Sequence, residues 1–495
     1  MPATVTLDGR SLSIADVVAV ARQGARVAVA PDTHERVARS RACVEAAVAR
    51  GETIYGVNTG FGKLAHVRIP TDALRALQLN LIRSHASGVG DPLPVEAVRA
   101  MMLLRANVLL TGTSGVRPVI PEALVAMLNA AVHPIVPSQG SVGASGDLAP
   151  LSHLALALIG EGEDGARLQA AGLQTVTLEA KEGIAFVNGT QAQTGLAALL
   201  LHDGWTLWRT AHAAAAMSLE AVRGTPVPFD ARIHDARPHP FQQRSAALLR
   251  ALLADSEIRE SHRQGDPRVQ DAYSLRCTPQ ILGAVGEGLA FAERVVATEL
   301  NAATDNPLVF GEEVLSGGNF HGQPIALALD VLGIALATLG GLAERRLERV
   351  VNPDLSSGLP AFLAHDPGLD SGFMTAQIAA AALVADSRVL ATPASIQSIP
   401  TEANQEDVVP MGMTAAWKAG RIFANTARVV AIELLAGAQG LEFLKPLQPG
   451  RGVARIYDVI RREVPPLEAD RPMGAEIERV AAGVQAGRFD PEALA

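Results

Sequence analysis

The chain has 495 residues, a formal net charge of −9 at pH 7, and only two cysteines, Cys43 and Cys277. Its length is enough to bury a large core and is typical of two or three domains. The acidic balance argues against nucleic acid and anionic membrane surfaces as partners and fits a protein that acts on small molecules. Two cysteines exclude a disulfide framework and a cysteine-rich metal site, so we expect no metal and a reducing, cytoplasmic location.

The composition and one long apolar segment predict a mainly α fold. Hydrophobic residues make up 48% of the chain but aromatic residues only 4%, as expected for long helices that pack through Ala, Leu and Val. Residues 324–343 are apolar except for Asp330 and Thr338, and this segment is long enough to cross a bilayer. The position of Asp330 well inside the segment and the mixed charges that follow at 344–349 favour a core helix over a membrane span. Residues 1–5 lack the basic start and apolar run of a signal peptide, so we expect no membrane partner.

Helices are expected in regular succession, separated by proline and glycine signals. His85 would lie near a helix end on a face shared with Gln78, where a lone histidine is more often structural than functional. In chain order we expect a strand at 5–7, helices at 13–21, 33–50 and 71–85 (with Thr71 as N-cap), two helices within 94–133, a helix at 151–160, a hairpin or irregular excursion at 161–180, a helix opening at 181–191, successive helices from about 200, and a polar tail with one or two helices at 440–495.

A glycine-rich loop follows the second helix, where residues 55–63 read Tyr-Gly-Val-Asn-Thr-Gly-Phe-Gly-Lys. Gly56 and Gly62 are spaced too widely for a phosphate loop of the Walker type. Lys63 is also followed by Leu64, where that pattern requires Ser or Thr. From the residues alone, this segment is a mobile surface loop that carries a tyrosine. A tyrosine could act as an acid or base there only if its neighbours made the phenol more acidic.

Residues 140–150 read Gly-Ser-Val-Gly-Ala-Ser-Gly-Asp-Leu-Ala-Pro and allow an unusual reaction. In a tightly bent backbone, the amide nitrogen of Gly146 can attack the carbonyl carbon of Ala144. Loss of water from that adduct and from the Ser145 side chain leaves a conjugated five-membered ring, which is an electrophile made from the chain itself. Only glycine tolerates the backbone angles of so compressed a loop. Such segments are nevertheless more often simple turns that cap a helix.

A serine-hydrolase interpretation of the same loop is disfavoured. The nucleophile elbow needs a final glycine, which is absent after Gly143-Ala144-Ser145-Gly146-Asp147, and a preceding strand, which we do not expect.

A polar segment at 269–280 is the third candidate for chemistry. If it is locally helical, Gln270, Tyr273 and Arg276 share one face, with Pro279 interrupting the helix. The planar guanidinium of Arg276 can donate two parallel hydrogen bonds to a substrate carboxylate. A surface arginine in an ion pair is the commoner alternative.

Several strings, in the same order over residues 10–480, resemble those of the ammonia-lyase family that acts on aromatic amino acids through 4-methylideneimidazole-5-one (MIO). They lie at 55–62, 140–153, 188–191 (Asn-Gly-Thr-Gln), 270–277 (Gln-Asp-Ala-Tyr-Ser-Leu-Arg-Cys), 317–321 (Gly-Gly-Asn-Phe-His) and 404–407 (Asn-Gln-Glu-Asp). The resemblance implies an MIO formed from Ala144, Ser145 and Gly146, with no external cofactor. It also implies a fumarase/aspartase-like fold, with a long central helical bundle and a smaller α-rich N-terminal domain that carries the MIO loop.

The same resemblance implies catalytic roles for single residues. Tyr55 would be the acid/base group on a lid loop, and Asn188 and Tyr273 would support the ring and the substrate amine. Glu406 is a second candidate acceptor for the β-proton of the substrate, and the choice between Glu406 and Tyr55 stays open.

Other residues would bind the substrate. Arg276 would anchor its carboxylate, Gln270 would contact it, and Phe320 would form a pocket wall that keeps the ring in place. His85, which follows Ser84, and Glu406 are similar to the positions that bind the imidazole in the histidine-specific members of the family.

Some positions depart from the histidine-specific pattern. Gly322 and Gln323 replace the usual Ala-Glu pair, Ser-Ile-Gln-Ser at 395–398 replaces the usual Ser-Val-Asp-Ser, and Val408 replaces a His after Glu-Asp. These departures bear on the choice of substrate and leave the type of reaction unaffected.

The resemblance predicts a carbon–nitrogen lyase that converts L-histidine to trans-urocanate and ammonia, the first step of histidine degradation. The chain would form a cytoplasmic homotetramer with active sites shared between chains, and each chain would have domains at 1–200 and 201–495. The alternatives are an MIO-dependent tyrosine or phenylalanine ammonia-lyase or 2,3-aminomutase, a serine hydrolase, and a non-catalytic helical scaffold.

Overall fold

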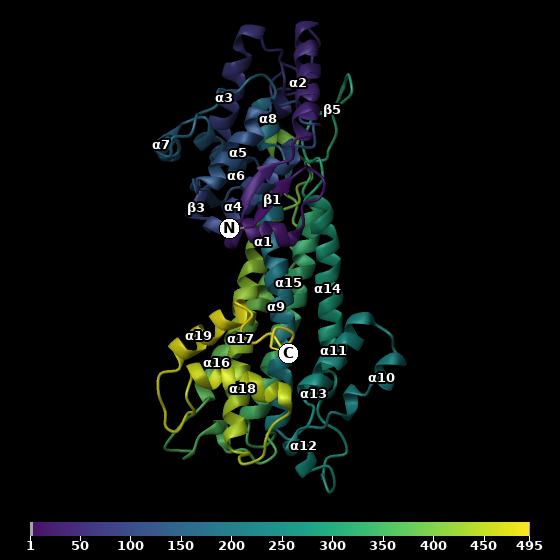
Figure 1. Ribbon diagram of the computed structural model, residues 1–495, viewed down its shortest axis with the longest axis vertical. Coiled ribbons are helices and arrows are strands. Elements are labelled where there is room, and N and C mark those ends of the chain that lie inside the picture. The colour runs from purple at the N-terminus through teal and green to yellow at the C-terminus, as the bar shows by residue number, and fades with distance from the viewer. Residues whose placement is uncertain (1–2, 495) are drawn as a thin grey trace. The chain divides into compact units, whose positions relative to one another are not determined.

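The computed structural model describes residues 3–494, so Met1 and Pro2 of the N-terminal stretch considered above lie outside the described residues. The described chain divides into two compact units, whose elements are labelled in Figure 1. Unit 1 comprises the residues up to 202 together with 292–330 and 393–417, and unit 2 comprises 203–291, 331–392 and the residues from 418 onward. The domain boundary near residue 200 stays a prediction, because compact units need not fold independently.

Unit 1 is built mainly of short helices around α4 (Val95–Leu109), whose side chains are buried from Ala97 to Leu109. Helices α1 and α5 pack against α4, and Ser13 begins α1 with a capping box closed by Asp16. The remaining elements are β1 (Thr4–Leu7), α1 (Ile14–Arg22), β2 (Arg26–Val29), α2 (Thr33–Ala49), α3 (Leu74–His85), β3 (Val89–Pro92), α5 (Val119–Asn129), β4 (Pro137–Gln139), α6 (Leu148–Leu158), α7 (Gly162–Ala170), α8 (Glu182–Val187), β5 (Leu308–Phe310), β6 (Glu313–Leu315), and the 3-10 turns η1 (Gly62–Leu64), η2 (Thr71–Ala73) and η5 (Glu402–Asn404).

The strands of unit 1 form three small two-stranded sheets. Strands β1 and β2 are parallel, with Val5 opposite Val27. Strands β3 and β4 are antiparallel with an irregular register, and β5 and β6 form an antiparallel hairpin with Val309 opposite Val314. The sheets are therefore accessories to a helical framework, which confirms the predicted mainly α fold.

Three local predictions in unit 1 are wrong. Helix α7 occupies part of 161–180, where we expected a hairpin or excursion, because Leu168 is buried and Gly165 packs directly on the backbone of Gly160. Thr71 is not the N-cap of α3, since it begins the 3-10 turn η2 and makes no side-chain capping bond. A strand, β4, does precede the 140–150 loop.

Three helices of unit 1 bring the ends of distant segments together. Helices α3, α6 and α8 pack against one another. His85 is the last residue of α3, α6 begins directly after the 140–147 loop, and α8 ends immediately before Asn188. Gln78 on α3 ties this arrangement together, because its Oε1 accepts the backbone N–H of Gly183 at 2.9 Å.

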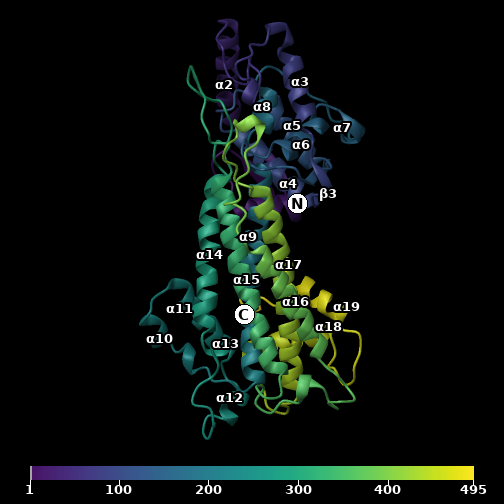
Figure 2. The same cartoon turned by 180° about the vertical axis from the view of Figure 1, so that it is seen from behind.

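Unit 2 contains the larger parts of four long helices, which run side by side within it (Figures 1 and 2). Buried Arg346 on α15 donates to Glu433 on α17 at 2.9 Å, and Ser218 on α9 donates to the same carboxylate at 2.8 Å. The long helices are α9 (Gln191–Ala221), α14 (Thr278–Glu299), α15 (Gln323–Val351) and α17 (Gly412–Glu442), and the shorter elements are η3 (Val227–Phe229), α10 (Ala231–Asp235), α11 (Pro240–Leu252), α12 (Glu257–Ser261), α13 (Tyr273–Arg276), η4 (Ala361–Leu363), α16 (Met374–Leu390), α18 (Arg451–Glu463) and α19 (Gly474–Gln485).

Helix α15 is the apolar segment that resembles a membrane span. Among the described residues it is the one helix long and apolar enough to cross a bilayer, and 67% of its most apolar window is buried inside the protein. Asp330 within it accepts the backbone N–H groups of Ala394 at 3.0 Å and Ser395 at 2.7 Å. A buried carboxylate with two such partners is expected of a helix packed in a protein core.

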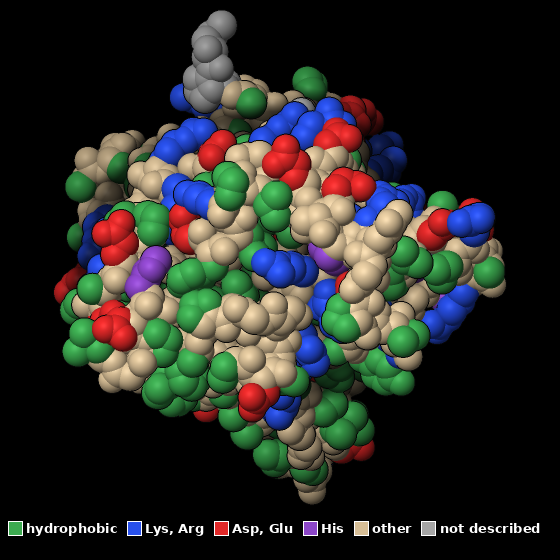
Figure 3. Space-filling view, turned by 90° about the horizontal axis from the view of Figure 1, so that it is seen from below, with side chains coloured by type: hydrophobic (Ala, Val, Ile, Leu, Met, Phe, Trp, Pro, Cys, Tyr) green, Lys and Arg blue, Asp and Glu red, His purple; other side chains and the backbone are tan. Residues whose placement is uncertain are grey.

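One face of the molecule is drawn in space-filling form in Figure 3. Its Lys and Arg side chains are interspersed with Asp and Glu, so neither sign forms a continuous field on that face.

Candidate active site

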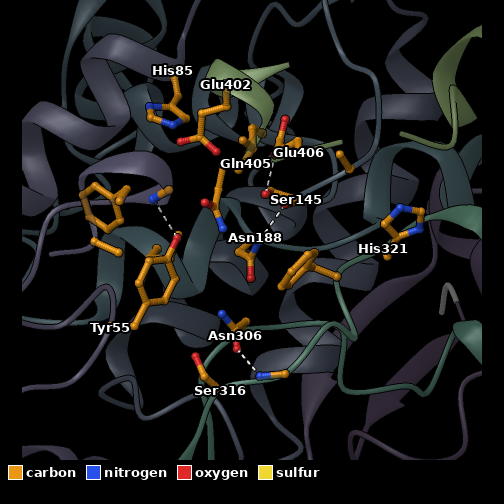
Figure 4. Close-up of a pocket in the computed structure, with 18 of the residues that line it drawn as sticks. Tyr55, His85, Ser145, Asn188, Asn306, Ser316, His321, Glu402, Gln405 and Glu406 are labelled. Carbon is orange, nitrogen blue, oxygen red and sulfur yellow. Dashed lines mark hydrogen bonds between the residues drawn. The ribbon is translucent and has the colours of Figure 1, made fainter. Parts of the chain in front are cut away.

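Segments far apart in the sequence enclose a cavity of about 520 Å³ in unit 1 (Figure 4). This volume suits a small organic ligand. None of its described lining residues is a lysine or an arginine. The predicted site residues that line it are Tyr55, His85, Ala144, Ser145, Asn188, Phe320 and Glu406.

The loop at 143–147 is compressed against the backbone of Gly189. Gly143 and Gly146 are bridged across the turn, and Gly146 is also bridged to Gly189. Gly146 has φ +76°, and a Cβ there would lie 2.3 Å from the carbonyl oxygen of Gly189, so only glycine fits. Asp147 closes the loop by accepting the Gln193 N–H at 2.9 Å, and burial raises the pKa of Asp147 to about 6.

The residues of this loop fit a ring made from their own backbone. Asn188 Nδ2 donates a 2.7 Å hydrogen bond to the carbonyl oxygen of Ser145. That oxygen would remain on the five-membered ring, where a donor would draw electron density away from the conjugated system. Asn188 Oδ1 is buried without a hydrogen-bond partner among the described residues, which leaves an acceptor for a ligand N–H group.

Tyr55 lies on the loop that ends in η1, with its hydroxyl directed into the cavity (Figure 4). The backbone N–H of Gly62 donates to the Tyr55 hydroxyl at 3.0 Å. Burial raises the pKa of Tyr55, and the carboxylates of Glu402 and Glu406 add to this effect. The side chains of this pocket therefore do not make the phenol more acidic, which was the condition for Tyr55 to act as a base.

Glu406 faces the ring-forming loop. The Ser145 hydroxyl donates to Glu406 Oε1 at 2.6 Å, and the Thr401 hydroxyl donates to Glu406 Oε2 at 2.6 Å. Thr401 N–H also donates to the Glu406 carbonyl oxygen at 2.9 Å. The tight turn at 401–406 thus fixes the carboxylate, and both of its oxygens have a donor.

His85 reaches the cavity from the end of α3 (Figure 4). Ser84 Oγ lies 2.9 Å from His85 Nδ1, so the neighbouring serine helps to orient the ring. Burial lowers the pKa of His85, although the charge of Glu406 opposes this effect. A neutral imidazole has one donor and one acceptor nitrogen and can pair with a second imidazole.

The 317–323 segment forms the wall on which Phe320 lies. Gly322 N–H donates to the carbonyl oxygen of Gly143 at 3.1 Å, which joins this segment to the ring-forming loop. A Cβ at Gly322 would lie 2.3 Å from Gln193 Nε2, so an alanine at this position would displace the end of the Gln193 side chain. His321 Nε2 lies 3.0 Å from the carbonyl oxygen of Val408.

Sequence reasoning gave no role to several polar residues that also line the cavity, among them Glu402, Gln405 and Asn306. Glu402 and Gln405 are labelled beside His85 and Glu406 in Figure 4. The available signal was that Gln405 belongs to the Asn-Gln-Glu-Asp string and Glu402 lies two residues before it. Asn306 accepts the Gly317 N–H at 2.7 Å, a contact that no local pattern could indicate.

Gln270, Tyr273 and Arg276 belong to unit 2 and are not among the residues that line the unit 1 cavity. The Arg276 guanidinium stacks 4.6 Å from the centre of the Tyr273 ring. Tyr273 is 70% exposed, and Arg276 Nε has no hydrogen-bond partner among the described residues. Gln270 and Arg276 line a separate cavity of about 600 Å³ within unit 2. Pro279 lies in the first turn of α14, after a break at Cys277.

Comparison with known proteins gives consistent matches over nearly the whole chain. A family model described as aromatic amino acid lyase matches residues 12–462. A histidine ammonia-lyase of Myxococcus xanthus (strain DK1622) is 52% identical over 497 residues, covering 98% of this chain and 97% of that protein. The structure of histidine ammonia-lyase from Trypanosoma cruzi is 41% identical with a TM-score of 0.91, covering 99% of this chain and 95% of that one. Tyrosine aminomutase from Streptomyces globisporus is 40% identical with a TM-score of 0.94, covering 98% and 97%.

Proposed function

Because the chain belongs to the aromatic amino acid lyase family, we propose that it removes ammonia from L-histidine to give trans-urocanate, as the first step of histidine degradation. One observation carries this proposal: Ser145, His85 and Glu406 line a single cavity. The residue that would become the electrophile therefore shares a pocket with two groups that can pair with an imidazole. The names of relatives about half identical to this chain support the same substrate.

The proposed electrophile is an MIO built from Ala144, Ser145 and Gly146, and when present it supplies an electron-poor carbon for the substrate amine. Asn188 holds the Ser145 carbonyl oxygen through its 2.7 Å hydrogen bond. Phe320, which lines the same cavity, would form a pocket wall that keeps the ring in place. The bridge between Gly143 and Gly146 shows that the chain turns back on itself across this segment, as ring closure between Ala144 and Gly146 would require.

The substrate side chain would lie between His85 and Glu406. Glu406 would accept the imidazole N–H, and the neutral His85 would pair with a ring nitrogen or orient the ring. The β-proton would go to Glu406 or to Tyr55. The raised pKa of Tyr55 favours a neutral phenol that donates, so in this pocket Glu406 is the better candidate acceptor.

The substrate carboxylate needs a cation that the unit 1 cavity does not contain among its described residues. We infer that Arg276 of a second copy supplies it, together with Gln270 and with Tyr273 as support for the ring. Arg276 is suited to this role because its Nε lacks a partner and a guanidinium binds carboxylate through two parallel hydrogen bonds. Shared sites of this kind require more than one copy of the chain, and we propose a cytoplasmic homotetramer.

The alternative is a tyrosine or phenylalanine lyase, or a 2,3-aminomutase. Gly322 and Gln323 depart from the histidine-specific pattern, and the tyrosine aminomutase structure is closely similar. Such an enzyme would keep the ring and change the residues that contact the side chain. His85 and Glu406 in the cavity wall favour histidine over these substrates.

Mixing the purified protein separately with L-histidine, L-tyrosine and L-phenylalanine tests the proposal. We expect the ultraviolet absorption of a conjugated acrylate with histidine only, and none from the Ser145→Ala variant. Product from tyrosine or phenylalanine would overturn the substrate assignment and keep the reaction type. No product from any of the three would contradict the proposed function.

A further inference from the structure

The turn at 401–406 holds an unusual backbone that carries two carboxylates of the cavity wall. Glu402, Ala403 and Asn404 have φ values of +50°, +53° and +64° in succession. Residues other than glycine rarely adopt this left-handed conformation, and three in a row persist only where surrounding contacts hold them. The hydrogen bonds between Thr401 and Glu406 close the turn. Glu402 is thereby aimed at the loop that carries Tyr55.

Glu402 contacts that loop at Gly62 and Lys63. A Cβ at Gly62 would lie 1.5 Å from Glu402 Oε1, so the carboxylate occupies the space of the missing side chain. The backbone N–H of Lys63 interacts favourably with the same carboxylate and lowers its pKa. The preceding N–H, of Gly62, donates to the Tyr55 hydroxyl at 3.0 Å. Successive peptide groups of η1 therefore hold Tyr55 on one side and Glu402 on the other.

The pKa of Glu402 reflects its position between Glu406 and the η1 turn. Burial raises its pKa, the charge of Glu406 raises it further, and the Lys63 N–H lowers it. Much of the Glu402 side chain is nevertheless exposed. Ordinary solvation would favour a carboxylate that points away from Glu406, so the contact with η1 must offset that preference.

We propose that Glu402 is a positioning residue that fastens the loop carrying Tyr55 to the turn carrying Glu406. The two groups that handle protons in the proposed reaction would then keep a fixed separation. Glu402 does not itself touch the ring-forming loop. The attachment of the loop is independent of the substrate, whereas its effect on turnover rests on the proposed function.

Limited trypsin digestion measures the attachment directly, because Lys63 is exposed and lies inside the fastened segment. We expect Glu402→Ala to speed cleavage after Lys63 by about tenfold, since the contact of the carboxylate with η1, which opposes local opening, is lost. Glu402→Gln keeps an acceptor oxygen and should stay within about threefold of the unchanged protein. Glu312→Ala, which removes another exposed carboxylate of unit 1, is the matched control and should have no effect. The new fragment is identified by its N-terminus at Leu64.

A second variant tests the contact from the other side. Gly62→Ala would push the Glu402 carboxylate away and should also speed cleavage after Lys63. In a Glu402→Ala background the same change should add much less, because the atom that it displaces is gone. Equal cleavage rates in Glu402→Ala, Glu312→Ala and the unchanged protein would overturn the proposal.

Kinetics with L-histidine separate positioning from a merely structural role. Glu402→Ala should lower kcat by about tenfold with little change in KM, and Glu402→Gln should restore it. In a Tyr55→Phe background Glu402→Ala should lower kcat no further, because its effect passes through Tyr55. A full additional loss in that background would contradict positioning through Tyr55. If no variant turns over histidine, the proposed function fails while the digestion result still decides the attachment.

Discussion

Ser145 Oγ donates a 2.6 Å hydrogen bond to Glu406 Oε1, joining residues that lie 261 positions apart in the chain. The hydroxyl that ring formation must remove therefore faces the carboxylate proposed to bind the imidazole. Thr401 donates to the other oxygen of the same carboxylate. Because Ser145 and Thr401 fix the Glu406 carboxylate, an imidazole bound to Glu406 would lie beside the ring formed at Ser145.

Replacing Glu406 by glutamine keeps the shape of the side chain and removes its ability to accept a proton. We expect kcat/KM for L-histidine to fall by roughly 10²- to 10⁴-fold, the range typical of a lost general base. Steady-state assays of urocanate formation measure this. The ring should still form in this variant, so an unchanged kcat/KM would remove Glu406 from the mechanism.

Gly146 and Gly172 form a matched pair for the compressed loop. Both have a left-handed backbone, with φ of +76° and +73°, but a Cβ would meet the Gly189 backbone only at Gly146 and has open space at Gly172. We expect Gly146→Ala to lower the free energy of unfolding by about 1–3 kcal/mol more than Gly172→Ala, through overpacking. Thermal unfolding of both variants makes the comparison. Similar midpoints would mean that the loop is not compressed.

Co-expression of two inactive variants tests the shared active site. Ser145→Ala lacks the electrophile and Arg276→Ala lacks the carboxylate anchor. If each site takes Ser145 from one chain and Arg276 from another, random mixing should restore about a quarter of the sites in the mixed oligomers. Turnover of L-histidine by the purified mixed protein is the measurement. Absence of any recovery would place both residues in the same copy.

The lowered pKa of His85 predicts a pH dependence of stability. Above the ordinary histidine pKa of 6.5 the imidazole is neutral in both the folded and the unfolded chain. As the pH falls below 6.5 the unfolded chain binds the proton first, so the His85 contribution to the free energy of unfolding is lost. We expect the free energy of unfolding to change less between pH 5.5 and pH 7.5 in His85→Asn than in the unchanged protein. An identical difference would show that His85 titrates normally.

Local patterns predicted the helical framework, and the resemblance of short strings to the family predicted seven of the residues that line the cavity. The apolar stripe of α3 and the small residues around Ser145 are visible in the sequence without any tertiary contact. Helix α7 was missed because its glycines lower helix propensity, and packing of Gly165 on Gly160 outweighs that preference. The Thr71 cap was wrong because a 3-10 turn precedes α3.

The cavity also contains residues whose positions depend on long-range geometry. Glu402 reaches Gly62 only because three successive residues adopt a left-handed backbone, and no sequence period indicates such a turn. Gln78 ties α3 to α8 through the N–H of Gly183, a contact between residues 105 positions apart. Resemblance of short strings identified residues that carry chemistry, but not those that hold them in place.

The mass of the peptide containing residues 140–147 most directly tests the claim that this chain builds its own electrophile. Purified protein that turns over L-histidine is digested, and the peptide is compared with its counterpart from Ser145→Ala, which lacks the hydroxyl that supplies the second water. We predict that the peptide from the active protein is lighter than its sequence requires by two molecules of water. An unmodified Ala144-Ser145-Gly146 peptide from fully active protein would contradict the proposed mechanism.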